Sequence, residues 1–167
     1  MSGRVQIRVA RADDAGHITW MLKQLAIELG DGTVFASTES TIRRHGFGPD
    51  ASFSTMLAET DGAPQGLALY FRHFSTTRGL PGVYVQDLWI APEQRGARLG
   101  TRLLATVAEN AAHAWEAAYL TLSVYHDNPA AAQFYSRLGF AAHQNDAPMS
   151  LTGPAFKDLA GSAGSLA

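Results

Sequence analysis

The chain has 167 residues, of which 46% are hydrophobic and 17% charged, and it contains no Cys. This size and composition predict one compact globular domain and exclude disorder over most of the chain. Without Cys there is no disulfide framework, no thiolate nucleophile and no cysteine metal site, and we expect no metal centre. The formal net charge of −2 gives no general attraction to nucleic acid or to an anionic membrane.

The hydropathy pattern predicts no membrane segment. The first residues lack the apolar core of a secretory signal, and no later stretch approaches the roughly 18 apolar residues of a membrane span. The absence of Cys fits a reducing compartment. We therefore expect a soluble, cytoplasmic protein.

The N-terminal part of the chain predicts a strand and two helices. Apolar and polar residues alternate over 5–9, which is the period of a half-buried strand. A helix capped by Asp13 or Asp14 is expected to run to Leu29 and to end at Gly30. A shorter helix is expected over 38–45, with Ser37 as its cap.

Three strands are expected next. Those over 53–59 and 66–74 form a hairpin joined by turn residues at 61–64. A turn-rich loop over 75–82 follows, and we expect it to enclose one side of a binding site. A strong strand pattern then covers 83–90.

The apolar period changes from two to between three and four beyond Pro92, which predicts a helix from Leu99 to Trp115. A strand is expected over 119–124, followed by a short helix over 129–138. Asn128 and Pro129 open that helix and Gly139 closes it.

One or two strands over 140–151 complete the pattern. The order of elements predicts the α+β class, with a mixed, largely antiparallel sheet flanked by helices. We expect a single domain over 1–160 and a flexible tail over 161–167.

The segment 87–104 predicts a strand, a short loop with two glycines and a helix. Such a junction directs unpaired backbone N–H groups to one place, and glycine lets a phosphate approach the backbone. Arg95, Arg98 and Arg102 add positive charge there. An ordinary turn with solvent-facing arginines would have the same pattern. The spacing matches neither the P-loop nor the Gly-x-Gly-x-x-Gly fingerprint, so those two nucleotide-binding classes are excluded.

Residues 95–100, Arg-Gly-Ala-Arg-Leu-Gly, resemble the pyrophosphate-binding motif of the GNAT family of N-acetyltransferases, Arg/Gln-x-x-Gly-x-Gly/Ala. Arg98 stands where the family usually has glycine. A second resemblance lies downstream, where the family pattern is Asn-x-x-Ala-x-x-x-Tyr-x-x-x-Gly-Phe. The residues at those spacings are Asn128, Ala131, Tyr135, Gly139 and Phe140.

The resemblance implies a GNAT-like fold with a V-shaped split between two central strands, and acetyl-CoA as the cosubstrate. An amine would attack the thioester directly, and Tyr135 would donate a proton to the departing thiolate. A backbone N–H at 88–90 would stabilise the oxyanion. Asn128 would bind the cofactor or its loop, whereas the Trp89 side chain suits the core or an acceptor-pocket wall. The residues implied to bind the cofactor are Leu88, Trp89, Ile90, Arg95, Gly96, Ala97, Arg98, Leu99, Gly100, Thr101, Asn128 and Ala131.

Direct attack requires a neutral amine, so the site must accept a proton, directly or through a water. Asp87 is the first candidate for this base, with a purely structural carboxylate as the alternative. His126 is the second candidate and His73 the third.

Most of the chain also resembles the diamine (spermidine/spermine-type) acetyltransferase branch of the family. That branch has Tyr-Leu-Glu-Asp where this chain has Tyr84, Val85, Gln86 and Asp87, so Asp87 is the remaining acid. The resemblance implies a small-molecule amine acceptor of polyamine, diamine or lysine-analogue type, and a homodimer. The alternatives are acetylation of a protein N-terminus or lysine, and a non-catalytic CoA-sensing module.

Overall fold

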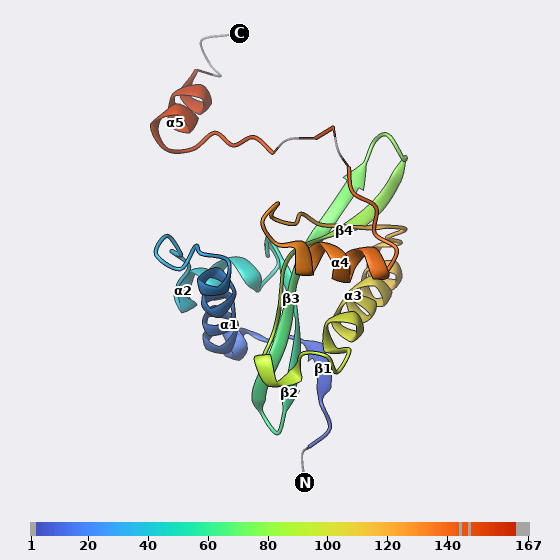
Figure 1. Cartoon of the computed structure of the whole chain (residues 1–167). Helices are drawn as coiled ribbons and strands as arrows, with labels where there is room; N and C mark the ends of the chain where they lie inside the picture. The colour runs from blue at the N-terminus through green and yellow to red at the C-terminus, as the bar shows by residue number, and fades with distance from the viewer. Residues whose placement is uncertain (1–2, 144, 147, 163–167) are drawn as a thin grey trace. The chain divides into compact units, whose positions relative to one another are not determined.

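The structure, a computed structural model, describes residues 3–143, 145–146 and 148–162 (Figure 1). Its contacts group the chain into two compact units, one ending at Asp127 and the other beginning at Asn128. Each unit is described by itself.

The first unit contains a five-stranded sheet in the order β1-β2-β3-β4-β5. Neighbouring strands from β1 to β4 are antiparallel, and β5 is parallel to β4. The predicted α+β class with a largely antiparallel sheet is therefore confirmed. The strands are β1 (Gln6–Val9), β2 (Ser54–Thr60), β3 (Ala63–Ser75), β4 (Leu80–Ile90) and β5 (Leu120–Thr121).

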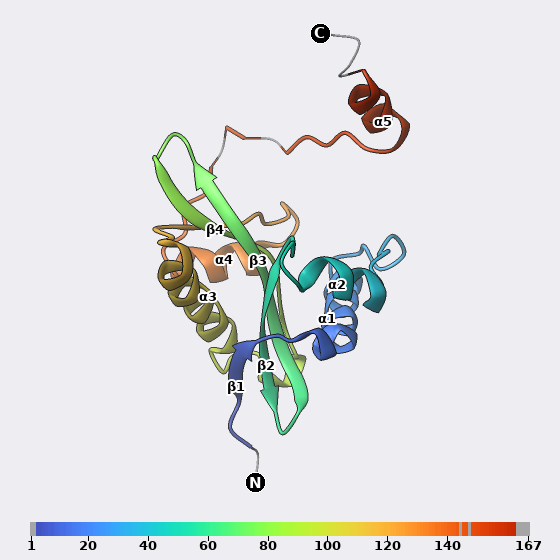
Figure 2. The ribbon, with the colours of Figure 1, turned by 180° about the vertical axis from the view of Figure 1, so that it is seen from behind.

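Helices cover both faces of this sheet. Figures 1 and 2 show α1 and α2 on one side of β3 and β4, and α3 on the other. The helices are α1 (Ala15–Glu28), α2 (Glu39–Gly46) and α3 (Leu99–Trp115), with short 3-10 turns η1 (Ala12–Asp14) and η2 (Pro92–Gln94). All three predicted helices of this part of the chain are confirmed.

Each face of the sheet has its own apolar core. On the α1 side, Ile18 and Met21 pack with Leu67 and Trp89. On the α3 side, the buried apolar stripe of the helix includes Leu103, as its 3.6-residue period predicts. Burying these stripes against both faces holds β3 and β4 at the centre of the unit.

An ionic cluster ties β1 to its neighbours. The Arg8 guanidinium donates to Asp14 at 2.7 and 2.9 Å and to Glu59 at 2.8 and 3.0 Å. These bonds raise the pKa of Arg8 and lower that of Asp14. Both carboxylates of this partly buried cluster therefore bind one guanidinium within the fold.

Two boundaries differ from the sequence predictions. The α2 cap is Thr38 rather than Ser37, because Thr38 and Thr41 exchange side chain to backbone hydrogen bonds. The β2–β3 turn contains only Asp61 and Gly62, at φ of 50° and 79°, which is the left-handed geometry of a tight hairpin turn.

The predicted loop over 75–82 is wrong. β3 and β4 stay paired as far as Ser75 and Leu80, and only 76–79 form the turn. Pro81 and Gly82 suggested a loop, but both belong to β4. Gly82 is needed there because a Cβ would lie 2.3 Å from the Tyr119 ring.

The second unit contains α4 (Pro129–Arg137) and α5 (Gly153–Gly161). The first was predicted and the second was not. The prediction of strands over 140–151 is wrong for the described residues of that range, which exclude 144 and 147. None of these residues pairs with a strand, and a strand needs such a partner to be stable. The first residue of the predicted tail, Gly161, is the last residue of α5. Residues 163–167 of that tail lie outside the described residues. The domain boundary at 160 stays a prediction.

Within the described part of the chain, no helix is both long and apolar enough to cross a membrane.

Candidate active site

β4 and β5 separate shortly after they meet. Their pairing covers Val83 with Leu120 and Tyr84 with Thr121. The β3–β4 register then shifts, so that Leu69 faces Asp87 while Tyr70 faces Val85, and Gln86 is the extra residue of a β-bulge. A bulge bends its strand and increases its twist. Among the described residues, no strand pairs with β4 on the β5 side beyond this point.

The separation leaves one edge of β4 open along 85–90. Backbone N–H and C=O groups on such an edge need partners, and an extended ligand with amide groups can supply them in the manner of an added strand. Near the point where β4 and β5 are still paired, a 2.9 Å hydrogen bond joins the Tyr84 and Ser123 hydroxyls. The open edge thus begins at a fixed point, where β4 and β5 are still joined.

Asp87 is the acidic group on this stretch of β4. Its side chain is half-buried and lies on the same face as Trp89, two residues along the strand, which is the face that α1 covers. It forms no hydrogen bond or ion pair with any described residue. Burial raises its pKa to about 6. A carboxyl group with this pKa can exchange a proton near neutral pH.

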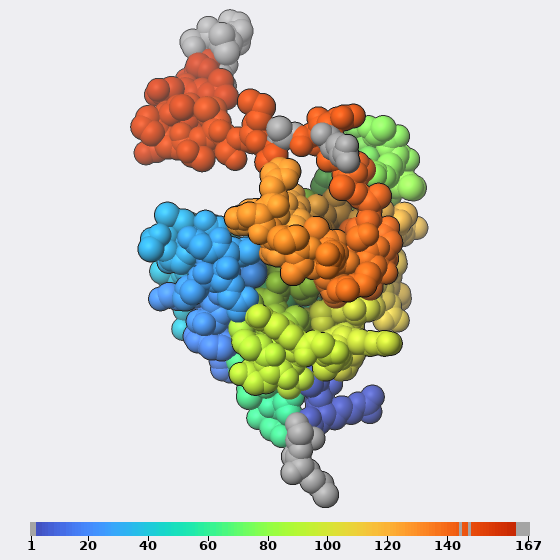
Figure 3. Space-filling model, in the orientation of Figure 1, coloured from blue at the N-terminus to red at the C-terminus, as the bar shows by residue number. Residues whose placement is uncertain are grey.

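The loop between η2 and α3 is shaped to receive an anion. Gly96 and Arg98 have left-handed backbone conformations, with φ of 81° and 60°, and Gly96–Arg98 is exposed. The first N–H groups of α3, from Leu99 onward, have no acceptor within the helix, and the helix dipole favours negative charge there. The yellow-green segment containing η2 and this loop is open at the surface in Figure 3.

The left-handed conformation of Arg98 explains why the family motif has glycine at this position. An L-residue other than glycine adopts this conformation at a cost of about 1–2 kcal/mol. The guanidinium has no partner among the described residues. Nothing lies within 4 Å of where a Cβ on Gly96 would be, so a phosphate has room to approach. These residues therefore fit the pyrophosphate of acetyl-CoA.

The Arg95 side chain has a structural partner instead. Its Nη2 donates to both Glu28 oxygens at 2.7 and 2.8 Å, and its Nε donates to the Ile90 carbonyl at 3.0 Å. Trp89 Nε1 also donates to Glu28, at 3.1 Å, and its buried ring meets Trp20 edge to face. Glu28 thus joins the end of α1 to β4 and to the anion loop.

Arg95, Arg98 and Arg102 form the arginine group that the sequence predicts at this loop. Within it, the charge of Arg95 is offset by Glu28. A third member, Arg102, donates to the carbonyl of Val5, the residue before β1, at 3.1 Å. Arg98 is the guanidinium of this group that has no contact with the described residues.

Tyr135, in the second unit, lies on α4 between the rings of Phe134 and Phe140, at centroid distances of 5.0 and 5.3 Å. Burial raises its pKa to about 12. The phenol therefore stays protonated at neutral pH and can act as a proton donor.

The rest of the downstream motif builds this helix. The Asn128 side-chain oxygen accepts from the Ala131 N–H at 3.2 Å and caps α4, and Gly139 ends it at φ 94°. The Phe140 N–H donates to the Tyr135 carbonyl, which places the Phe140 ring against Tyr135. The motif thus has a structural basis, and it leaves the Tyr135 phenol available for chemistry.

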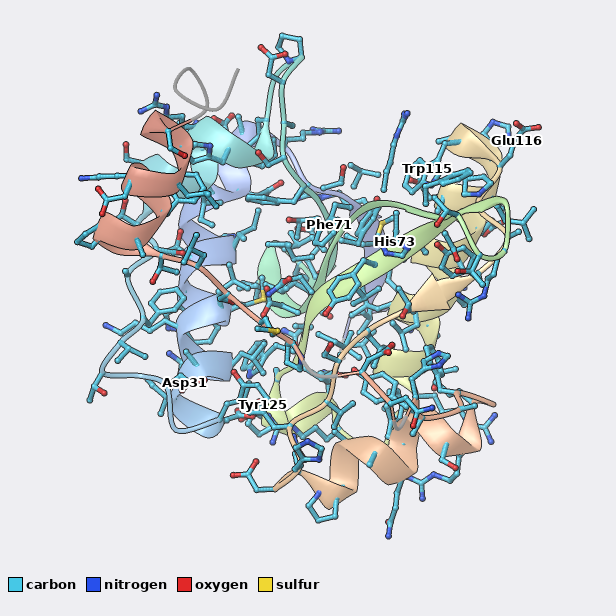
Figure 4. All side chains as sticks on the ribbon, turned by 90° about the horizontal axis from the view of Figure 1, so that it is seen from above. Asp31, Phe71, His73, Trp115, Glu116 and Tyr125 are labelled. Carbon is cyan, nitrogen blue, oxygen red and sulfur yellow. The ribbon has the colours of Figure 1, made fainter. Side chains whose placement is uncertain are left out.

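The two histidine candidates differ in their surroundings. His126 is exposed. His73 forms a short hydrogen bond with the Tyr119 phenol, and its ring also lies near that of Tyr84. His73 belongs to β3 and is labelled in Figure 4. In the described residues, no group of three or more His, Asp or Glu side chains is arranged to hold a metal ion.

The acetyltransferase (GNAT) family profile matches residues 21–140. The chain belongs to the GNAT family of acetyltransferases. This membership makes it an acetyl-CoA-dependent N-acetyltransferase, as the two motifs implied.

The chain is similar to a known acetyltransferase in sequence and to solved structures in fold. The thialysine N-epsilon-acetyltransferase of Bos taurus is 31% identical over 143 residues, which are 81% of this chain and 83% of that protein. An integron cassette protein from the mobile metagenome of V. cholerae has a TM-score of 0.77 at 21% identity, over 96% of this chain and 98% of its own. An aminoglycoside N-acetyltransferase in complex with CoA has a TM-score of 0.72 at 15% identity, over 90% and 97%.

Sequence analysis of this GNAT protein missed Glu28. An acidic residue is unfavourable at the end of a helix, because the helix dipole is negative there. An acidic side chain at the negative end of the helix dipole is therefore the sequence signal that could have indicated a cationic partner for Glu28. Asp31 and Tyr125, which are hydrogen-bonded to each other, carry no comparable signal.

We predict that Arg98→Gly stabilises the fold and weakens CoA binding. Glycine removes a backbone cost of about 1–2 kcal/mol, so the Tm rises. Loss of the guanidinium removes a charge-assisted phosphate contact of about 1.5–3 kcal/mol, so the Kd for CoA rises about tenfold or more. Thermal melts and calorimetric titration with CoA measure the two effects.

Glu116→Gly is the matched control, because Glu116 also has φ 60°, at the opposite end of α3. It should raise the Tm by a similar amount and leave the CoA affinity unchanged. An unchanged CoA affinity in Arg98→Gly would show that the Arg98 side chain does not contact the phosphates.

Proposed function

We propose that this enzyme acetylates a primary amine of a small molecule of the diamine, polyamine or lysine-analogue type. The observation that carries the proposal is the open edge of β4, with the half-buried Asp87 beside it and no cation paired with that carboxyl group among the described residues. The name of the Bos taurus relative, which refers to a lysine analogue, supports the same class of acceptor.

The cosubstrate would be held by two parts of the first unit. The edge of β4 at 88–90 offers backbone groups to the amides of the pantetheine arm. Residues 96–101 offer the free N–H groups at the start of α3, and Arg98 adds a positive charge. Asn128 and Ala131, at the start of α4, complete the proposed set. Bound acetyl-CoA supplies the thioester that the amine attacks.

Each remaining step uses a residue of this chain. Asp87, directly or through a water, accepts a proton from the ammonium group, so that a neutral amine forms the N–C bond. A backbone N–H at 88–90 donates to the carbonyl oxygen as it gains negative charge. Tyr135 donates its proton to the sulfur as the C–S bond breaks. The nitrogen, which gained a positive charge on attack, loses a second proton as the amide forms, and this proton passes through solvent to restore the Tyr135 phenol. The chain has no Cys to form an acyl-enzyme, which favours direct transfer.

A protein N-terminus or lysine remains the second candidate for the acceptor. The expectation of an enclosed site rested on a loop over 75–82, and the structure has a paired hairpin there instead. This removes one reason to exclude a peptide. Assays with small amines and with peptides should therefore run in parallel.

We predict that Tyr135→Phe lowers kcat by about 10²–10⁴-fold with little change in the Kd for CoA, because it removes a proton donor and keeps the ring packing. Release of free CoA, followed with a panel of small amines and peptides, measures the rate. Tyr70→Phe removes another phenol, which donates to Asn110 Oδ1 on α3, as a control for kcat. Wild-type turnover with peptides alone would contradict a small-molecule acceptor, and an unchanged kcat in Tyr135→Phe would remove this residue from the mechanism.

We predict opposite effects of Asp87→Asn on activity and stability. The raised pKa means that the folded state favours the protonated carboxyl, so ionisation destabilises the wild type as the pH rises from about 4 through about 6. At pH 7 the variant should be more stable by up to about 3 kcal/mol, and the difference should vanish below about pH 4. Urea titrations at several pH values measure this.

The wild-type kcat/KM should rise with pH up to about 6 and then level, because the base must be ionised, whereas Asp87→Asn should lose at least about 10²-fold. Asp50→Asn removes an exposed carboxylate as a control and should change neither property. Full activity of Asp87→Asn would assign the base to His126 or to solvent.

We also propose that the enzyme is a cytoplasmic homodimer. Acetyl-CoA as cosubstrate and the absence of Cys support the location. Several large apolar side chains of the second unit are exposed, which favours a partner surface. These are Met149, Leu151, Phe156 and Leu159, with exposed fractions of 95%, 48%, 58% and 62%.

We predict that Phe156→Asp combined with Leu159→Asp converts the dimer into a monomer, as measured by light scattering. Lys157→Ala, on the same helix, is the control and should leave the mass unchanged. A wild-type protein that is monomeric at all concentrations would contradict the dimer. Cell fractionation tests the location.

A further inference from the structure

A hydrogen bond outside both sequence motifs joins two segments beside the candidate site. The Tyr125 hydroxyl donates to Asp31 Oδ2 at 2.9 Å. Asp31 lies in the loop after α1, and Tyr125 lies beyond the end of β5, on the strand side that separates from β4. Figure 4 shows the two side chains next to each other.

The end of α1 therefore contacts the segments on both sides of the separation between β4 and β5. Glu28 binds Trp89 on β4 and Arg95 in the anion loop, while Asp31, three residues later, binds Tyr125 on the β5 side. Two fixed points hold this short segment, so the Asp31 carboxylate has a defined position. The face of β4 that Glu28 contacts through Trp89 also carries Asp87, so Asp31 and Asp87 lie on the same side of the sheet.

Asp31 and Asp87 are half-buried acidic groups without a cationic partner. The partly buried Asp14 and Glu59 both bind Arg8, and Glu28 is paired with Arg95. Asp31 has a neutral phenol as its partner, and the described residues contain no cation paired with it or with Asp87. Exposed carboxylates of the first unit can lack a cation at little cost because solvent screens them. Two half-buried carboxylates on the same side of the sheet are stabilised if a bound molecule brings two positive charges.

We propose that Asp31 is a specificity-determining residue that binds the second, non-reacting ammonium group of the acceptor while Asp87 serves the amine that is acetylated. This inference rests on the proposed acetylation of a small amine. Tyr125 is a positioning residue, since its hydroxyl holds one Asp31 oxygen and leaves the other for the acceptor. The second amino group that diamines, polyamines and lysine analogues share would thereby be bound by Asp31.

The test compares 1,5-diaminopentane with 1-aminopentane, which has the same chain length and one amino group. Asp31→Asn keeps an oxygen that accepts from Tyr125 and removes the charge. It should raise the KM for the diamine about tenfold, the effect of losing a hydrogen bond between charged groups at a partly exposed site, and leave the KM for the monoamine and the Kd for CoA unchanged. Tyr125→Phe keeps the charge and should raise the diamine KM by a smaller factor, with kcat unchanged.

Asp127→Asn is the matched control, because Asp127 is an exposed carboxylate whose charge also acts on Tyr125. It should change the ratio of the two KM values by less than about twofold, as is usual for exposed charges. Equal changes for diamine and monoamine in Asp31→Asn, or no change for either, would overturn the role of Asp31 while the proposed acetylation stands. Failure of the wild type to acetylate both amines would overturn the proposed function and this inference with it.

Discussion

The bulge at Gln86 is the constraint on which the site depends. β4 must pair with β3 along its whole length to complete the core, yet it must also leave β5 after Tyr84. One extra residue meets both demands, because it bends the strand without ending the β3–β4 ladder. A regular β4 would continue beside β5, and its edge would be used within the sheet. The open edge and the position of Asp87 both follow from that single residue.

The end of α1 is the second organising feature. Its amphipathic face is buried against the sheet by ordinary hydrophobic packing, and this fixes where the helix ends. Glu28 and Asp31 then turn that end into a connection between the anion loop, β4 and the segment after β5. The two proposed binding sites, for cosubstrate and acceptor, would therefore both be attached to the end of α1.

Local patterns explain which parts could be predicted from the sequence. The helix over 99–115 and the caps at Asn128 and Gly139 depend on residues close in the chain. The pairing of Arg95 with Glu28 spans 67 positions and leaves no trace in periodicity. Pro81 and Gly82 suggested a loop because turn residues also occur where a ring, here that of Tyr119, needs space. The prediction of strands over 140–151 was wrong because a strand needs a neighbouring strand, which no local pattern specifies.

Two residues of the site cost the fold stability. Arg98 occupies a left-handed conformation that glycine would adopt freely, and Asp87 is a half-buried carboxyl group with no partner among the described residues. Asp61, in the β2–β3 turn, and Glu116, at the end of α3, also adopt left-handed conformations, so this backbone cost is not confined to the site. Asp87 differs from them because its carboxyl group is half-buried and has no partner among the described residues, whereas the partly buried Asp14 and Glu59 both bind Arg8. A cost of this kind is retained where binding or chemistry needs it, which supports placing the reaction beside the open edge of β4.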